Sequence, residues 1–189
     1  MFMVLKLVRF KRALLLLISL LLVVTVFVFY NSAIVNYFYP LKYSDQVYKF
    51  SSQYNLDPYL VFAIIKAESN FNPTAVSYRN ARGLMQLTEK TGGWGAESLK
   101  MKDYTCEKLF VPEININIGC WYVSRLMQEF NYDLDLVIAA YNGGSGNVKG
   151  WLNDKDLSSS GKKLDKIPFK ETEGYLKKVK RFYSMYKKI

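Results

Sequence analysis

The chain of 189 residues contains no histidine and only two cysteines. The absence of histidine excludes Ser-His and Cys-His nucleophilic mechanisms in their usual forms, because both use an imidazole as the base. It also excludes zinc sites with histidine ligands, and two thiols are too few for a site built from cysteine alone. We therefore predict no metal and no cofactor, which leaves chemistry carried out by carboxylates, or no chemistry.

The two cysteines, Cys106 and Cys120, leave two interpretations open. In an oxidising environment they would be able to form a disulfide that closes a short loop. Alternatively, both are small buried apolar residues that never meet. We favour the second interpretation, although the sequence does not show how far apart their Cα atoms lie.

Acidic residues are also few, with 16 Asp and Glu against 26 Lys and Arg, which gives a net charge of +10. The basic residues are spread along the chain and accompany no recognition helix, zinc finger or RNA-binding motif, so we predict no nucleic-acid partner. A positive net charge also favours binding to an anionic polymer or to anionic lipid. After Glu173 the chain carries only basic charges, and we interpret this row as a contact with such a surface.

An uncharged apolar run covers residues 13–30 and continues weakly to residue 35. Crossing a bilayer takes about 20 such residues, and the run follows four basic residues, Lys6, Arg9, Lys11 and Arg12. The positive-inside rule then predicts a cytoplasmic segment at 1–12, a transmembrane anchor at 13–35 and a juxtamembrane linker at 36–44. This is a single-pass cell-membrane topology with the remaining domain on the extracytoplasmic side. The alternative is a cleaved signal peptide, whose apolar core is normally shorter and whose small-x-small cleavage site is not evident here.

Beyond Pro40, apolar residues recur at helical spacing, so the sequence predicts a mainly α domain with no internal repeat and no convincing strand pair. A short helix is expected after Gly83, but Gly92, Gly93 and Gly95 leave the next stretch uncertain. A polar segment at 153–166 indicates a loop. The expected helices are a short one around Val47 and others at 57–69, 115–130, 134–141, 147–152 and 171–187.

Glu68 lies on a helix face that is otherwise apolar. Asp57 as N-cap and Pro58 at the first helical position predict the helix start, and Val61, Ile64 and Ile65 share one face with Glu68. Loss of solvation on that face raises the pKa of a carboxyl group, which suits a general acid near neutral pH. The alternative is an acid at the helix end that turns to solvent or caps a neighbouring turn.

Short motifs follow Glu68 in a recognisable order: Glu68-Ser69, Gly83-Leu84-Met85-Gln86, Asn115-Ile116-Asn117-Ile118-Gly119 and Ala140-Tyr141-Asn142-Gly143-Gly144. Each motif is weak alone, but the ordered set is specific. It resembles the lytic transglycosylase (SLT-type, lysozyme-like) family over about residues 45–185. The resemblance implies a lysozyme-like catalytic domain at 45–189 that acts on peptidoglycan glycan strands.

The resemblance also implies a reaction with one carboxylate. Glu68 would protonate the glycosidic oxygen between N-acetylmuramic acid and N-acetylglucosamine, and then act as base on the muramoyl C6 hydroxyl. That hydroxyl closes a 1,6-anhydro ring without water. The implied substrate-binding residues are Ser77, Gln86, Tyr141, Asn142 and Tyr175, with Ser77 also bonding around the catalytic carboxyl.

Simpler roles remain open for three of these residues: an ordinary loop serine for Ser77, a core aromatic for Tyr141 and a helix C-cap for Asn142. The chain also departs from the family pattern at Leu87-Thr88-Glu89 and at Gly92-Gly93-Trp94-Gly95, which replaces a stretch that is normally helical. Glu89 is the only other acid that we consider for catalysis. The alternatives to a lytic transglycosylase are a goose-type lysozyme hydrolase, which needs a positioned water, and a glycan-binding scaffold without turnover. Protein partners are not indicated.

Overall fold

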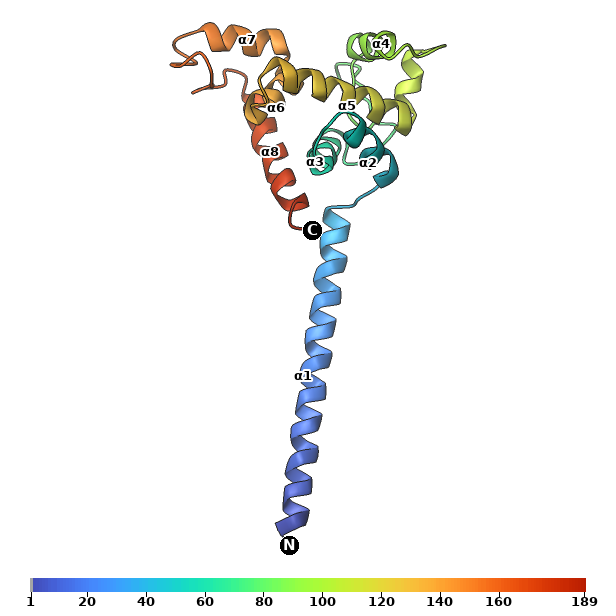
Figure 1. Cartoon of the computed structure of the whole chain (residues 1–189), viewed down its shortest axis with the longest axis vertical. Helices are drawn as coiled ribbons and strands as arrows, with labels where there is room; N and C mark the ends of the chain where they lie inside the picture. The colour runs from blue at the N-terminus through green and yellow to red at the C-terminus, as the bar shows by residue number, and fades with distance from the viewer. Residues whose placement is uncertain (1) are drawn as a thin grey trace. The chain divides into compact units, whose positions relative to one another are not determined.

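The computed structural model describes the backbone of residues 2–189 and the side chains of residues 14–27 and 34–189. The chain forms two compact units, Met1–Leu41 and Lys42–Ile189, and their boundary falls within the predicted linker. The first unit is the helix α1, Phe2–Phe38 (Figure 1). Within the described residues, no helix has a stretch that is both long enough and apolar enough to cross a membrane. The predicted anchor includes residue 13 and residues 28–33, whose side chains lie outside the described part.

The second unit is mainly helical, which confirms the predicted mainly α domain. Its described residues contain only two isolated β-bridges, which join Val76 to Arg82 and Arg82 to Leu87. The sequence did not predict the 3₁₀ helix. The elements are α2 Ser44–Gln53, α3 Pro58–Ser69, α4 Glu89–Ser98, the 3₁₀ helix η1 Cys106–Phe110, α5 Pro112–Glu129, α6 Leu134–Gly143, α7 Ser145–Asn153 and α8 Lys170–Tyr186.

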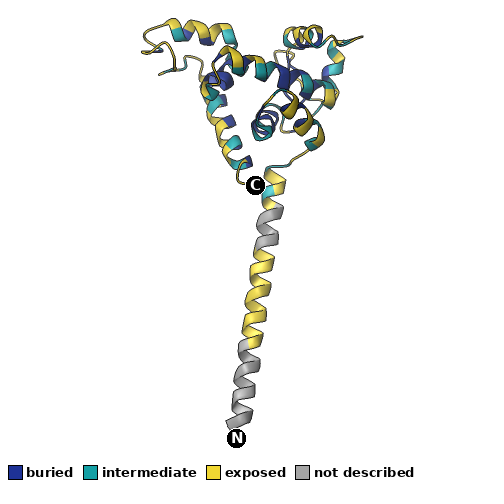
Figure 2. Ribbon diagram, in the orientation of Figure 1, coloured by how far each residue is buried: buried dark blue, intermediate teal, exposed yellow. Residues whose placement is uncertain are grey.

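Helix α3 forms the centre of the core and packs against α8 and α2. Its six residues from Leu60 to Ile65 are all buried, so both its faces are covered by protein (Figure 2). A helix that is apolar all round is stable only when it is buried in this way. Each such large side chain contributes about 1.5–3 kcal/mol when it leaves water, so the end of α3 that carries Glu68 is firmly held.

The start of α3 is fixed by its cap. Asp57 Oδ1 accepts a hydrogen bond from the Tyr59 backbone N–H at 2.9 Å, and Asp57 Oδ2 accepts one from the Tyr183 hydroxyl at 2.6 Å. The cap therefore also joins α3 to α8. It confirms the predicted start of the helix.

The glycine-containing stretch is helical, contrary to the expectation that it replaces a helix. Thr88 caps α4 by accepting from the Thr91 N–H at 3.2 Å. A Cβ atom on Gly95 would stand 2.4 Å from Ile118 Cγ2, and one on Gly92 would stand 2.3 Å from the Tyr104 hydroxyl. The glycines therefore let α4 pack closely on its neighbours, which outweighs their poor helix propensity.

Two other local features differ from or refine the sequence analysis. Helix α6 continues through Asn142 and Gly143, and Gly144, with φ of 88°, is its C-cap, so Asn142 is not the cap. Cys106 is half-buried, Cys120 is buried, and both are free thiols. Burial raises the pKa of the Cys120 thiol well above its usual range, as expected of an inert core residue.

Candidate active site

Glu68 lies in the last turn of α3, at one end of a cleft. The next residue anchors this turn, because the Ser69 hydroxyl donates to the Leu84 carbonyl at 2.8 Å. This bond joins the helix carrying the acid to the segment Gly83–Gln86. Ser69 is thus a structural link between two of the sequence motifs.

The segment that follows Arg82 is held by one buried amide. Asn115 has no exposed surface. Its Oδ1 accepts a hydrogen bond from the Met85 N–H at 2.8 Å. Its Nδ2 donates to the carbonyls of Arg82 and Leu109 at 2.9 and 2.8 Å. Gly83 has φ of 75°, and a Cβ there would stand 2.2 Å from the Leu109 carbonyl oxygen. Asn115 and Gly83 therefore shape the cleft without facing its interior.

Tyr141 and Asn142 reach the cleft from the end of α6. The Tyr141 hydroxyl donates to the Met85 carbonyl at 2.8 Å, and Asn142 Oδ1 accepts from the Thr172 hydroxyl at 2.8 Å. Burial raises the pKa of Tyr141 well above its usual value, and the nearby Glu68 charge adds to this effect. Tyr141 is therefore a fixed hydrogen-bond donor, and α8 orients the amide of Asn142.

Gln86 and Ser77 also line the cleft, but their described hydrogen bonds are with their own loop. Gln86 Nε2 donates to the carbonyls of Ala75 and Gly83 at 3.0 and 2.9 Å. Ser77 Oγ accepts from the backbone N–H groups of Arg79 and Ala81 at 3.3 and 3.1 Å. In both cases one polar function is used for loop shape, and the amide oxygen or the hydroxyl proton is left for other partners.

A cavity of about 150 Å³ brings the predicted residues together. Of the six residues predicted from the sequence, only Tyr175 is not part of its lining. Glu89 is also outside it, at the start of α4, so the acid that we considered as a second catalytic group does not face Glu68. The lining is Glu68, Ser77, Tyr78, Arg79, Ala81, Gln86, Thr88, Tyr141, Asn142 and Glu171.

The pKa of the Glu68 carboxyl is raised to about 7. Burial is the main cause, because the surrounding protein solvates the charged form poorly. Tyr175 and the positive charge of Lys178 lower the pKa, whereas the negative charge of Glu171 raises it. The Lys178 ammonium group donates to the Ala67 carbonyl at 2.6 Å, which brings its charge to the residue beside Glu68. The carboxyl can therefore hold and release a proton near neutral pH.

Tyr175 belongs to α8 and is buried. Its hydroxyl makes no hydrogen bond of ordinary distance and angle with the described residues, yet it is close enough to Glu68 to lower the pKa of that carboxyl. Burial and the Glu68 charge together raise the pKa of the Tyr175 hydroxyl well above its usual range. It is thus a neutral donor beside the acid.

Glu171 is a second carboxylate in the cavity that sequence reasoning missed. It lies in the first turn of α8, where its Oε2 accepts from Arg79 Nη2 at 3.4 Å and from the Tyr78 hydroxyl at 3.5 Å. These contacts join residues more than ninety positions apart, so local spacing gave no signal for them.

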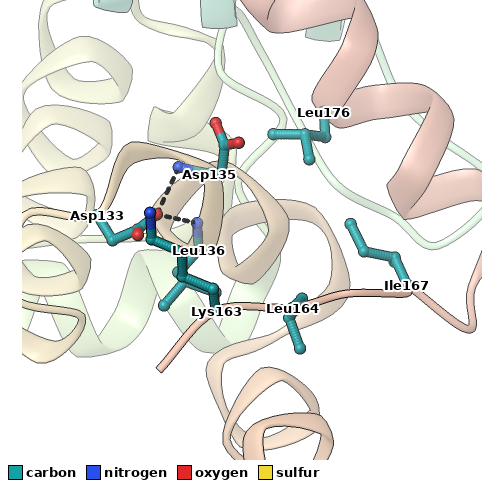
Figure 3. A pocket seen from close by; sticks show the side chains of 7 residues that line it. All are labelled: Asp133, Asp135, Leu136, Lys163, Leu164, Ile167 and Leu176. Atoms are coloured by element: carbon teal, nitrogen blue, oxygen red, sulfur yellow. Dashed lines mark hydrogen bonds between the residues drawn. The ribbon is translucent and has the colours of Figure 1, made fainter. Parts of the chain in front are cut away.

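A separate cavity of about 140 Å³ lies where α6 begins and α8 passes (Figure 3). Its two acids already have structural roles. Asp133 caps α6 through the N–H groups of Asp135 and Leu136, and Asp135 pairs with Lys180 at 2.7 Å. Within the described residues, no group of three or more Cys, Asp or Glu side chains is gathered as metal ligands. The Glu68 cavity is therefore the candidate active site.

Residues 46–163 match the Transglycosylase SLT domain family, and the chain belongs to it. This confirms the resemblance seen in the sequence.

Relatives of known identity agree with this assignment. The soluble lytic murein transglycosylase of Salmonella typhimurium is 33% identical over 151 residues, which cover 79% of this chain and 23% of that protein. Membrane-bound lytic murein transglycosylase C of Photorhabdus laumondii is 39% identical over 116 residues, covering 57% of this chain and 32% of that protein. The chain therefore spans about a quarter to a third of the length of these relatives.

The fold agrees with solved structures as well. The 70 kDa soluble lytic transglycosylase of Escherichia coli superposes with a TM-score of 0.73 at 31% identity, covering 82% of this chain and 25% of that one. An inactive Glu-to-Gln mutant of lytic transglycosylase Slt from Pseudomonas aeruginosa superposes with a TM-score of 0.70 at 29% identity, covering 79% and 24%. These matches confirm the lysozyme-like SLT fold.

Proposed function

We propose that this protein is a peptidoglycan lytic transglycosylase that cleaves the β-1,4 bond between N-acetylmuramic acid and N-acetylglucosamine. The observation that carries the proposal is the protonatable Glu68 carboxyl, with a pKa of about 7, in the lining of the cleft. A general acid is most effective when its pKa lies near the working pH. The relatives named lytic murein transglycosylases support the same reaction for this chain.

In this proposal Glu68 takes part in two proton transfers, first as an acid and then as a base. Its protonated carboxyl gives the proton to the glycosidic oxygen as the C1–O bond breaks, and the N-acetylglucosamine leaves with a free hydroxyl. The carboxylate then takes the proton of the muramoyl C6 hydroxyl as that oxygen bonds to C1. The product ends in a 1,6-anhydro ring, Glu68 is protonated again, and no water is consumed.

The other cavity residues bind and orient the sugars. Gln86 Oε1, the Ser77 hydroxyl proton and the Asn142 side chain provide the polar groups that acetamido and hydroxyl substituents need. Tyr175 supports the Glu68 carboxylate once it loses its proton, and its loose contact resembles catalytic hydrogen bonds that tighten when substrate binds. Tyr141 keeps the Met85 carbonyl, and with it the cleft wall, in position.

Glu171 favours one alternative, a hydrolase of the goose-type lysozyme kind. A second carboxylate in the same cavity is what a water-activating mechanism requires. However, Glu171 Oε2 is engaged by Arg79 and Tyr78, which favours a structural role for that oxygen. The two mechanisms leave different sugar ends, so the products decide between them.

Mass spectrometry of the products from purified peptidoglycan tests the proposal. We expect 1,6-anhydromuramic ends from the unmodified protein. Glu68→Gln should bind glycan but give no product, because an amide of similar shape cannot transfer the proton, whereas Glu97→Gln on the exposed surface of α4 should retain turnover. Reducing muramic ends as the main product would refute the transglycosylase mechanism and favour the hydrolase. Glycan binding without any product would favour the scaffold.

We also propose that residues 13–35 anchor the protein in the cell membrane, with residues 1–12 in the cytoplasm, 36–44 as linker and the catalytic domain outside. The apolar run with its preceding basic residues supports this topology. The membrane-bound names of several relatives are consistent with it. Removal of residues 1–41 should release an active soluble domain, since Lys42–Ile189 is a compact unit. Full-length protein that is washed from membranes by alkaline carbonate would contradict the anchor.

A further inference from the structure

The cavity between the start of α6 and helix α8 takes no part in the proposed reaction (Figure 3). Its volume is about 140 Å³, and it shares no lining residue with the Glu68 cavity. Asp133 caps the start of α6, whereas Asn142 lies in its last turn. At 1.5 Å per residue, this places the two residues about 13 Å apart along the helix. The cavity is therefore a separate space in the same domain.

Four aliphatic side chains form the apolar part of this cavity. Leu136 belongs to α6 and is buried, and Leu176 belongs to α8. Leu164 and Ile167 come from the loop that precedes α8, and both are half-buried. A cavity of about 150 Å³ with an aliphatic lining is large enough for a molecule of the size of benzene. The space therefore fits an aliphatic group of about four to six carbon atoms.

Charged side chains lie on the opposite side of the cavity. In Figure 3, Asp133 and Lys163 lie on one side, and Ile167 and Leu176 lie on the other. Asp133 caps α6 through Oδ1, and no hydrogen bond or ion pair among the described residues uses its Oδ2. The ammonium group of Lys163 forms no ion pair with the described residues. One carboxylate oxygen and one ammonium group are thus left for a bound molecule.

The third charged residue of the lining, Asp135, is already engaged. Each of its carboxylate oxygens lies 2.7 Å from Lys180 Nζ, so its charge is paired. The charges that remain are one negative and one positive, on Asp133 and Lys163. A molecule with one charge of each sign pairs with both, whereas a simple cation or anion leaves one of them without a partner. Charge complementarity therefore selects a zwitterion.

We propose that this cavity binds a small zwitterion with an aliphatic side chain, the chemical class of a free amino acid such as leucine. The ammonium group of the ligand pairs with Asp133 Oδ2, its carboxylate pairs with Lys163, and its side chain lies among the four aliphatic residues. The ligand contacts α6, α8 and the loop between α7 and α8 together, so its binding stabilises their packing. The site is independent of the reaction at Glu68 and stands whether or not the protein cleaves glycan.

An NMR titration of the isotope-labelled full chain in a detergent micelle with leucine tests this site. We expect saturable shifts of the backbone amides at 133–136, 163–167 and 176, with a Kd of about 1 mM or tighter. Alanine should bind about tenfold more weakly, because each buried CH₂ group adds to the affinity. Isoamylamine and isocaproate, which keep the aliphatic group but lack one charge each, should bind about fivefold more weakly than leucine.

Two variants remove the charges of the site without removing its structure. Asp133→Asn loses the negative charge but keeps a side-chain oxygen that can cap α6, and it should bind leucine about fivefold more weakly. Its matched control is Asp154→Asn, because Asp154 Oδ1 accepts from the Asp156 N–H at 2.9 Å in a similar turn outside the cavity. Lys163→Met should weaken binding by a similar factor, whereas Lys162→Met, at an exposed position outside the lining, should not.

Three outcomes would overturn the proposal: no saturable shift with leucine, shifts confined to the Glu68 cavity, or equal affinity for alanine and leucine. Unchanged affinity in both folded variants would overturn the charge pairing. If Asp133→Asn does not fold, Lys163→Met and the comparison of leucine with isoamylamine decide the matter. Glu68→Gln should bind leucine as the unmodified chain does. Failure of the proposed reaction would appear in the glycan products alone, and failure of this site would appear in the titration alone.

Discussion

Replacing Glu68 with glutamine should make the protein more stable at high pH. The pKa of Glu68 is raised from 4.5 to about 7 in the folded protein, mainly by burial. Between these two values the folded state therefore binds more protons than the unfolded state. By linkage, the free energy of unfolding falls as the pH rises through this window, and the loss is complete above the folded pKa. The glutamine side chain carries no charge, so the free energy of unfolding of Glu68→Gln does not fall in this pH window.

The size of the effect follows from the shift. Each pKa unit corresponds to about 1.36 kcal/mol, so moving from 4.5 to about 7 is worth roughly 3 kcal/mol. The advantage of Glu68→Gln should be near zero at about pH 4, where both states are protonated, and reach roughly 3 kcal/mol at about pH 8. For a protein of this size, 1 kcal/mol moves Tm by about 2–4 °C, so the difference in Tm should approach roughly 10 °C.

Urea unfolding of the full chain, repeated between about pH 4 and pH 8, measures this difference. Glu97→Gln is the matched control, because it removes a carboxylate that is exposed on α4. A stability difference for Glu68→Gln that stays constant with pH would refute the reasoning. A variant that is less stable than the unmodified protein at high pH would do so as well, because burial would then not disfavour the charged carboxyl.

Three further predictions concern Lys178, Tyr141 and two glycines. Lys178→Met removes a positive charge that lowers the Glu68 pKa, so the alkaline limb of the pH–activity profile should move to higher pH. The control Lys177→Met removes a cation that pairs with Glu173 instead, and it should leave the profile unchanged. Tyr141→Phe leaves the Met85 carbonyl without its donor and should cost about 1–2 kcal/mol in chemical unfolding. Gly83→Ala should lower the free energy of unfolding by about 3 kcal/mol or more, or prevent folding, because the added Cβ would stand 2.2 Å from the Leu109 carbonyl oxygen. Gly93→Ala should raise the free energy of unfolding by about 0.5–1 kcal/mol, because a Cβ at that position meets open space.

Local patterns were sufficient to predict the helix that carries the acid. The Asp57 cap, Pro58 and the apolar face act within a few residues of one another, so the sequence shows them directly. The direction of the Glu68 pKa shift was predictable in the same way, because burial is its main cause. The motif residues Gln86, Tyr141 and Asn142 also meet in the cleft as the resemblance implied.

Contacts between distant segments were not predictable in the same way. Asn115 was quoted only as part of a motif, yet its side chain holds Arg82, Met85 and Leu109. Nothing in the local sequence shows that an asparagine in an apolar helix satisfies three backbone groups of a loop. The uncertainty over α4 has a similar origin, since Gly92 and Gly95 have poor helix propensity but let the helix pack closely on its neighbours.

Helix α8 shows why the basic row at the end of the chain has more than one role. Glu171, Tyr175 and Lys178 follow one another at four and three residues, so they share a face. That face places the Glu171 carboxylate in the cavity, the Tyr175 hydroxyl near Glu68 and the Lys178 ammonium on the carbonyl of Ala67. Lys177 and Lys180 pair with acids elsewhere. Lys178, one of the basic residues that we predicted to contact an anionic surface, thus tunes the acid. For the cations outside these pairs, contact with such a surface stays a prediction.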